Sequence, residues 1–141
     1  MDVGLVLMKI EPEAKLEALP ITRTQTNKIE NIQIYGWILL KNETGNEVMN
    51  VASFAARTRS SPECTENTNN TDDSVLCLTV SSEFDSEVNQ MTFGSPVVVR
   101  RGGQMSLLGV AQFEQPVPRS PLYAYSLATH AAWIDSVIGN K

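Results

Sequence analysis

The sequence has few of the residues on which many kinds of site depend. Its 141 residues include one histidine and two cysteines, too few ligands for a zinc site. No window holds the roughly 18 consecutive apolar residues of a membrane-spanning helix. Eleven Lys and Arg stand against 16 Asp and Glu, giving a net charge of −5, whereas phosphate binding needs clustered cations. We therefore expect no metal, no cofactor, no membrane contact and no nucleic-acid partner.

The ends and loops give mixed indications of compartment. The first eight residues are apolar but carry Asp2 instead of a basic residue, and no small-residue cleavage site precedes Lys9, so we identify no secretion signal. The triplets that begin at Asn42 and Asn69 fit the N-glycosylation pattern, which favours a secreted protein. Cys64 and Cys77 flank a polar stretch and could form one disulfide or remain as two buried thiols.

Short apolar or alternating runs recur along the chain with turn-forming residues between them. The runs cover residues 32–40, 48–56, 75–80, 96–100, 106–113 and 122–125. Residues 42–46 and 101–104 are typical of hairpin turns. This spacing predicts an antiparallel barrel or sandwich. Residues 9–31 are polar and show no sustained period, so we interpret them as a connection that crosses the surface.

The last segment changes its period to that of a helix. One face would carry the apolar residues Leu127, Ala131, Ile134, Val137 and Ile138, and Gly139 follows as a natural end. The fold class predicted is all-β, an antiparallel barrel with one C-terminal α-helix. If that helix docks on the barrel, Trp133→Ala should cost about 3–5 kcal/mol.

Seven short signatures then follow in a characteristic order. They are segments 2–7 (DVGLVL), 18–20 (ALP) and 35–37 (YGW), the cysteines at 64 and 77, and segments 93–98 (FGSPVV), 107–113 (LLGVAQF) and 133–138 (WIDSVI). In this order the chain resembles the C-terminal half of a trypsin-like serine protease, although Ile38 replaces a glycine of the family pattern. The resemblance implies a domain division at residue 20: 1–20 as the remnant of the triad-Asp strand and interdomain connection, and 21–141 as the second barrel with its helix.

Two pairs of positions follow from the same resemblance. Cys64 and Cys77 match the pair that closes the loop before the specificity pocket, which implies a disulfide. A second family disulfide joins the positions of Ile32 and Val99, where this chain has two apolar residues. We therefore expect a core contact between Ile32 and Val99 in its place.

The resemblance also implies that catalysis is lost. The nucleophile position holds Phe93, which has no heteroatom to attack a carbonyl. Met91 occupies the position of an oxyanion-hole glycine, and Thr92 that of the aspartate that pairs with the freed N-terminus. Asp2 matches the triad aspartate, but the catalytic histidine belongs to a first barrel that this sequence does not contain.

Two other residues bear on a possible enzyme. Ser95 becomes a candidate nucleophile if the alignment absorbs a two-residue deletion, but it would need a base within hydrogen-bond reach. The single histidine, His130, lies on or just before the predicted helix, where a surface or interface role is the more common one. The positions that line the family's specificity pocket are occupied by larger side chains, which would fill it: Glu87, Gln112, Glu114 and Leu122.

These features predict a secreted, non-catalytic protease homologue that acts as a binding or regulatory protein, for example in a protease cascade. Its partner would be a protease, a substrate, an inhibitor or a second copy, bound through the surface that a first barrel would otherwise cover. The alternative is a truncated product of a secreted trypsin-like serine endopeptidase, because Met1 stands directly before Asp2. A third hypothesis is an unrelated β-barrel binding module.

Overall fold

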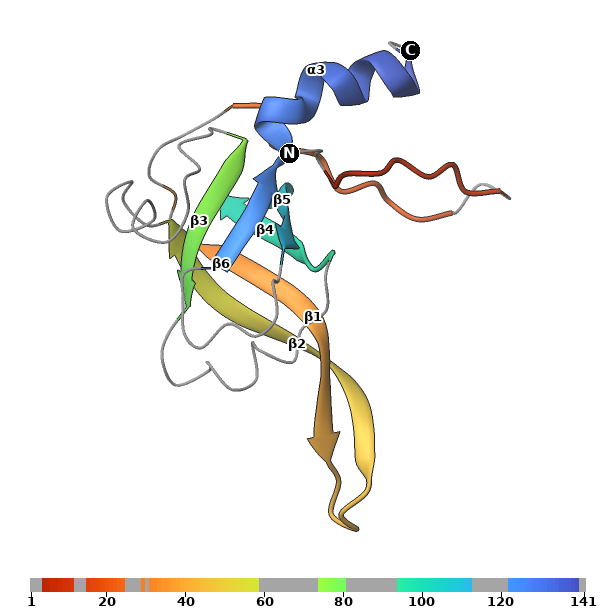
Figure 1. Ribbon diagram of the computed structural model, residues 1–141, viewed down its shortest axis with the longest axis vertical. Coiled ribbons are helices and arrows are strands. Elements are labelled where there is room, and N and C mark those ends of the chain that lie inside the picture. Colours follow the sequence, from red (N-terminus) through yellow and green to blue (C-terminus); the bar gives the residue numbers. More distant parts are fainter. Residues whose placement is uncertain are drawn as a thin grey trace.

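The chain folds into a closed barrel followed by one helix. The computed structural model describes residues 4–11, 15–24, 29, 31–58, 74–80, 94–112 and 122–139. Within these ranges the elements are β1 (Ile32–Lys41), β2 (Glu47–Thr58), β3 (Val75–Val80), β4 (Pro96–Arg101), β5 (Gln104–Gln112), β6 (Leu122–Ser126) and α3 (Leu127–Ile138). The strands pair antiparallel in the closed order β1-β2-β3-β6-β5-β4 (Figure 1). The predicted antiparallel barrel with a C-terminal helix is confirmed.

Two hairpins connect neighbouring strands where the sequence predicts them. In the β1–β2 turn the Gly45 N–H donates to the Asn42 carbonyl at 2.9 Å, and Gly45 has a φ of 81°. In the β4–β5 turn Gly102 and Gly103 have φ values of 56° and 80°. Side chains with a Cβ rarely adopt this left-handed region, so glycine is required at both turns.

The core fills the inside of the barrel with alternate residues from its strands. Ile32 of β1 lies directly opposite Val99 of β4, and the two are 1% and 0% exposed. The apolar contact predicted between these two positions is confirmed. The buried cluster contains Ile29, Ile32, Ile34, Ile38, Phe54, Ala56, Leu78, Val80, Val97, Val99, Leu108, Ala111, Leu122 and Ala124.

The segment before β1 is only partly the surface connection that the sequence suggests. Ile29 is 3% exposed and joins the core, and its N–H donates to the Thr58 hydroxyl at 2.9 Å. Further upstream, Thr22 N–H donates to the Leu107 carbonyl at 2.8 Å, and Leu107 N–H donates to the Pro20 carbonyl at 2.7 Å. Because β6 pairs with β5 only from Gly109 onward, this edge of β5 needs other hydrogen-bond partners, and the segment supplies them.

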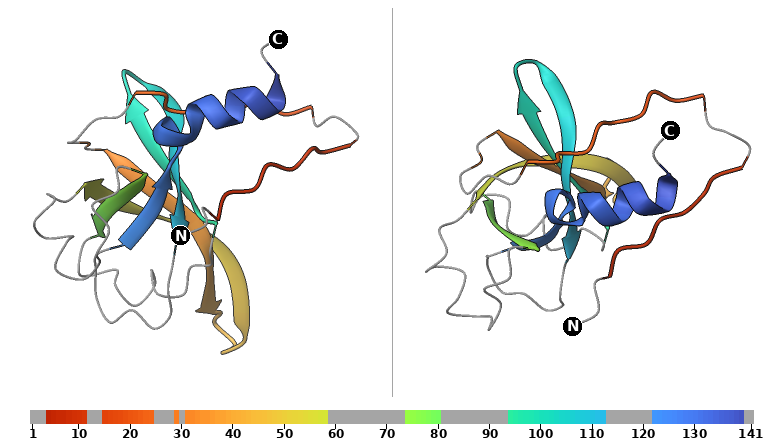
Figure 2. Two further views of the ribbon diagram at one scale, coloured as in Figure 1. Left: turned by 45° about the horizontal axis from the view of Figure 1, so that its top comes forward. Right: turned by 90° about the horizontal axis from the view of Figure 1, so that it is seen from above.

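The helix forms where predicted, but the C-terminal end of its predicted apolar face is exposed. Leu127 and Ile134 are buried, whereas Val137 and Ile138 are 56% and 60% exposed. Trp133 is 41% exposed. The helix starts at the end of the barrel and extends away from it, so its last turns have no strand beneath them (Figure 2). The predicted helix is therefore confirmed, and the barrel covers its first part only.

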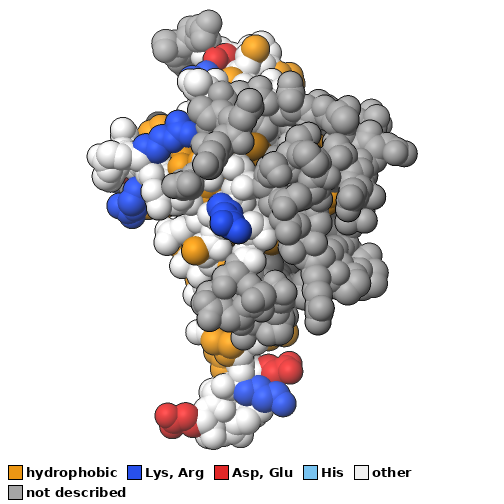
Figure 3. Space-filling model, turned by 90° about the vertical axis from the view of Figure 1, so that its left-hand side faces the viewer, with side chains coloured by type: hydrophobic (Ala, Val, Ile, Leu, Met, Phe, Trp, Pro, Cys, Tyr) orange, Lys and Arg blue, Asp and Glu red, His pale blue; other side chains and the backbone are white. Residues whose placement is uncertain are grey.

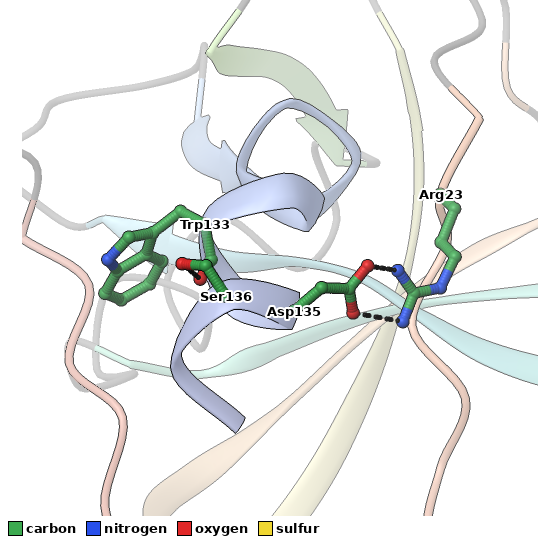
Figure 4. Close-up of polar contacts among 4 residues, drawn as sticks. All are labelled: Arg23, Trp133, Asp135 and Ser136. Atoms are coloured by element: carbon green, nitrogen blue, oxygen red, sulfur yellow. Dashed lines mark hydrogen bonds and ion pairs between the residues drawn. The ribbon is translucent and has the colours of Figure 1, made fainter. Parts of the chain in front are cut away.

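One ion pair joins the N-terminal segment to the helix. The two terminal nitrogens of the Arg23 guanidinium donate to the two oxygens of the Asp135 carboxylate, and the Nη2–Oδ1 bond measures 2.9 Å (Figure 4). This hydrogen bond lowers the pKa of Asp135 and raises that of Arg23. One residue along the helix, the Ser136 hydroxyl donates to the Trp133 carbonyl at 2.7 Å. The pair is largely exposed, so it positions the segment more than it stabilises the fold.

Candidate functional site

The start of β4 is the part of the predicted active-site region that the structure describes. Gly94 has a φ of 87°, and its N–H donates to the Ala111 carbonyl at 3.1 Å. Ala111 N–H in turn donates to the Ser95 carbonyl at 2.8 Å. These two bonds fix the Gly94-Ser95 backbone against β5. The chain here is part of the barrel wall.

Ser95 is 4% exposed, which limits its access to a substrate. A nucleophilic hydroxyl also needs a neighbouring base. None of the described residues that line the adjacent pocket is a histidine, an acid or a lysine. Phe93, Met91 and Asp2 lie outside the described residues, so the degenerate nucleophile, oxyanion and triad-aspartate positions stay predictions.

A pocket of about 380 Å³ opens beside this segment, where β1 separates from β4. Its walls come from three elements and are Tyr35, Gly36, Trp37, Val51, Gly94, Ser95 and Pro96. The Tyr35 hydroxyl donates to the side-chain oxygen of Gln33 at 2.8 Å, and Gln33 is not one of the residues that line the pocket. These seven described residues carry no charge, and their surface is suited to an apolar side chain. Sequence reasoning did not predict this pocket, because it depends on how far β1 follows β4.

The single histidine lies on a different part of the molecule. His130 Nδ1 is 2.7 Å from the Ser126 carbonyl oxygen one turn earlier on α3. Because a carbonyl oxygen only accepts, Nδ1 is the protonated nitrogen and donates this bond. No residue of α3 contributes to the pocket. The arrangement gives His130 a local role at the start of the helix.

The structure describes two of the four residues predicted to fill the specificity pocket. Leu122 begins β6 opposite Leu78 of β3 and is buried in the core. Gln112 ends β5 opposite Tyr123 and is half-buried. Glu87 and Glu114 lie outside the described residues. The filled pocket stays a prediction.

The predicted modification sites are likewise divided. Cys77 lies on β3 and is not a free thiol, whereas Cys64 lies outside the described residues. Asn42 lies at the exposed hairpin tip, where its side-chain oxygen accepts from the Asn46 N–H at 2.8 Å. Asn69 lies outside the part of the chain that is described. The disulfide and both glycans stay predictions.

Two further tests apply to the described ranges alone. They contain no group of three or more His, Cys, Asp or Glu residues that could hold a metal ion. Their helix is too short to cross a membrane.

The closed six-stranded barrel with its terminal helix is the trypsin-like fold. Among solved structures, the chain is similar to kallikrein-related peptidase 10 in complex with Zn²⁺, with a TM-score of 0.63 and 19% sequence identity. The match covers 87% of this chain and 56% of that protein, so the chain spans about half its length. No protein-family model and no curated protein matches the sequence.

Proposed function

We propose that this chain is a non-catalytic homologue of trypsin-like serine proteases that binds another protein without cutting it. One observation carries the proposal: the described residues that line the pocket beside the predicted nucleophile segment are apolar or uncharged. A protease site at this position needs a nucleophile, a base and an orienting acid in hydrogen-bond contact. Among the residues that the structure describes, those lining the pocket include no histidine, acid or lysine.

The sequence supports the same conclusion from the chemistry of single positions. Phe93 at the nucleophile position cannot form an acyl-enzyme, and loss of a triad member costs up to about a millionfold in related enzymes. Ser95 is buried at the start of β4, and the only histidine of the sequence donates its Nδ1 proton within α3. Both observations favour a chain in which Ser95 does not take over the role of the catalytic serine.

The proposed partner is a protease, a protease substrate or an inhibitor of the extracellular space. The similarity in fold to a peptidase nearly twice the length of the match supports a role beside complete proteases. A Cys64–Cys77 disulfide and glycans on Asn42 and Asn69 belong to the same proposal, because they require secretion. Asn42 is exposed, as a glycan requires.

The test is labelling with a fluorophosphonate together with hydrolysis of a broad panel of peptides. The native chain should neither label nor cleave, and Phe93→Ser should stay inactive because it restores the hydroxyl without a base. An active trypsin-like protease is the positive control for both reagents. Ser106→Ala is the matched control for Ser95→Ala, since Ser106 is half-buried on β5 and does not line the pocket.

The second candidate function is serine endopeptidase activity as half of a longer enzyme. It is favoured by the 56% coverage of the matched peptidase. This function predicts that the fluorophosphonate labels the native chain, that Ser95→Ala abolishes the labelling, and that Ser106→Ala leaves it unchanged. That result would overturn the non-catalytic proposal.

A further inference from the structure

The β1–β2 hairpin extends well beyond the barrel (Figure 1). β1 pairs with β4 only from Ile32 to Ile34, and β2 pairs with β3 only from Ala56 to Thr58. Past these residues, the strand pairing described for the hairpin is that of β1 with β2. We call residues 35–41 and 47–53 the ribbon. A two-stranded ribbon in water is marginally stable, so its faces gain from being covered.

One face of the ribbon carries four large apolar side chains in two adjacent rows. Trp37 pairs with Val51, and Leu39 pairs with Met49. Side chains of directly paired residues share a face, and so do those two positions apart on a strand. The four are 52%, 60%, 45% and 52% exposed in the order given. Figure 3 shows hydrophobic side chains gathered directly above the charged tip of the hairpin.

Polar rows border these apolar rows on both sides. Tyr35 pairs with Ser53 at the barrel end, and Lys41 pairs with Glu47 at the tip. From the barrel to the tip, the four rows of this face are therefore polar, apolar, apolar and polar. This order is the same from either end. Such a face is complementary to itself when two copies stack antiparallel, as a two-fold interface requires.

The antiparallel stack brings a specific side chain to the pocket. It places the Leu39/Met49 row of one copy over the Trp37/Val51 row of the other. Trp37 and Val51 are also walls of the 380 Å³ pocket at the base of the ribbon. Methionine is unbranched and flexible and fills irregular apolar spaces well. A central apolar anchor in a pocket is the usual form of an interface hot spot.

We propose that two copies of this chain associate through their ribbon faces, with Met49 of each copy in the pocket of the other. A second copy is the occupant that fits best, because the face has no charge at its centre to select a different partner and its own pattern complements it. The Lys41/Glu47 row then lies over the polar Tyr35/Ser53 row of the other copy. This association does not depend on whether the chain is catalytic.

The test is the oligomeric state of the chain by sedimentation equilibrium. The native chain should be a concentration-dependent dimer, and Met49→Glu should raise the dissociation constant at least about 30-fold, the loss expected of a hot-spot residue. Val48→Glu is the matched control, because it introduces the same charge on the opposite face of the ribbon. Val48 is 42% exposed. It should leave the dimer within about threefold, the scale of a position outside the hot spot. Circular dichroism verifies that each variant is folded.

A mixing experiment tests the antiparallel geometry. Val51→Lys alone should also disrupt the dimer, but Val51→Lys chains mixed with Met49→Glu chains should form mixed dimers, because the new charges then face each other. A native chain that stays monomeric at every concentration would overturn the proposal, and the face would then bind a different protein, if it binds one. Equal disruption by Val48→Glu, or failure of the mixed dimer to form, would also overturn it.

Discussion

Gly109 of β5 has no room for a side chain in the present position of its neighbours, not even for a methyl group. A Cβ built on Gly109 lies 2.6 Å from the backbone oxygen of Tyr125 on β6, and 3.4 Å from Leu76 Cδ1. Real Cβ atoms do not approach a backbone oxygen this closely, so Gly109→Ala must move β5 away from β6. Gly109 lies opposite Ser126, at one end of the β5–β6 ladder.

The size of the effect follows from two opposing contributions. Overpacking with a rigid neighbour costs about 1–3 kcal/mol. Replacing glycine in the unfolded chain contributes about 0.4–1 kcal/mol of stability in the other direction. We expect a net loss of about 1–2 kcal/mol, which for a domain of this size lowers the Tm by roughly 3–8 °C. Urea unfolding and calorimetry on the same samples measure both quantities.

A second substitution separates a backbone clash from a side-chain clash. The Ala124 Cβ is 3.5 Å from the added methyl, an ordinary contact. Ala124→Gly should therefore not rescue Gly109→Ala, since the Tyr125 oxygen stays in place. A Gly109→Ala chain more stable than the native one by the full unfolded-state gain would refute the close approach of the two strands.

Three other substitutions test the core, the helix and the ion pair. Ile32→Ala should cost about 2–5 kcal/mol in urea unfolding because Ile32 is 1% exposed, and a loss below that range would contradict the contact with Val99. Trp133→Ala should cost about 1–2 kcal/mol, less than the sequence suggests, because the side chain is 41% exposed; a loss of 3 kcal/mol or more would mean that something covers it. Arg23 lowers the pKa of Asp135 below its ordinary 3.8, so the pair contributes stability above that pH and loses it as the pH falls through the lower folded pKa. Asp135→Asn should remove this acid dependence from the Tm, and an unchanged pH profile would contradict the pair.

The strands were predictable because their signal is local. Period-two alternation and glycine at the turns place every strand end within two residues of its observed position. The contact of Ile32 with Val99 came from the family resemblance, which supplied a register that local periodicity cannot. The helix was predictable as an element, but periodicity does not say whether a strand lies beneath Val137 and Ile138. Their exposure follows from where the barrel ends.

The candidate site was less predictable, since it depends on residues far apart in sequence. The pocket joins Trp37 and Val51 to Pro96, and no local pattern indicates that β1 leaves β4 after Ile34. The ion pair joins residues 112 positions apart for the same reason. The residues predicted from the catalytic pattern, among them Phe93 and Met91, are outside the described ranges.

The Ile32–Val99 contact has a consequence for the conditions under which the barrel can close. The resemblance to trypsin-like proteases implies a disulfide at these two positions in that family, which would link barrel closure to the oxidation of two thiols. Here β1 and β4 meet through two buried apolar side chains and backbone hydrogen bonds, neither of which responds to a reductant. The seam between β1 and β4 should therefore form equally well in oxidising and reducing surroundings, and any effect of a reductant on the barrel should come through Cys77 on β3.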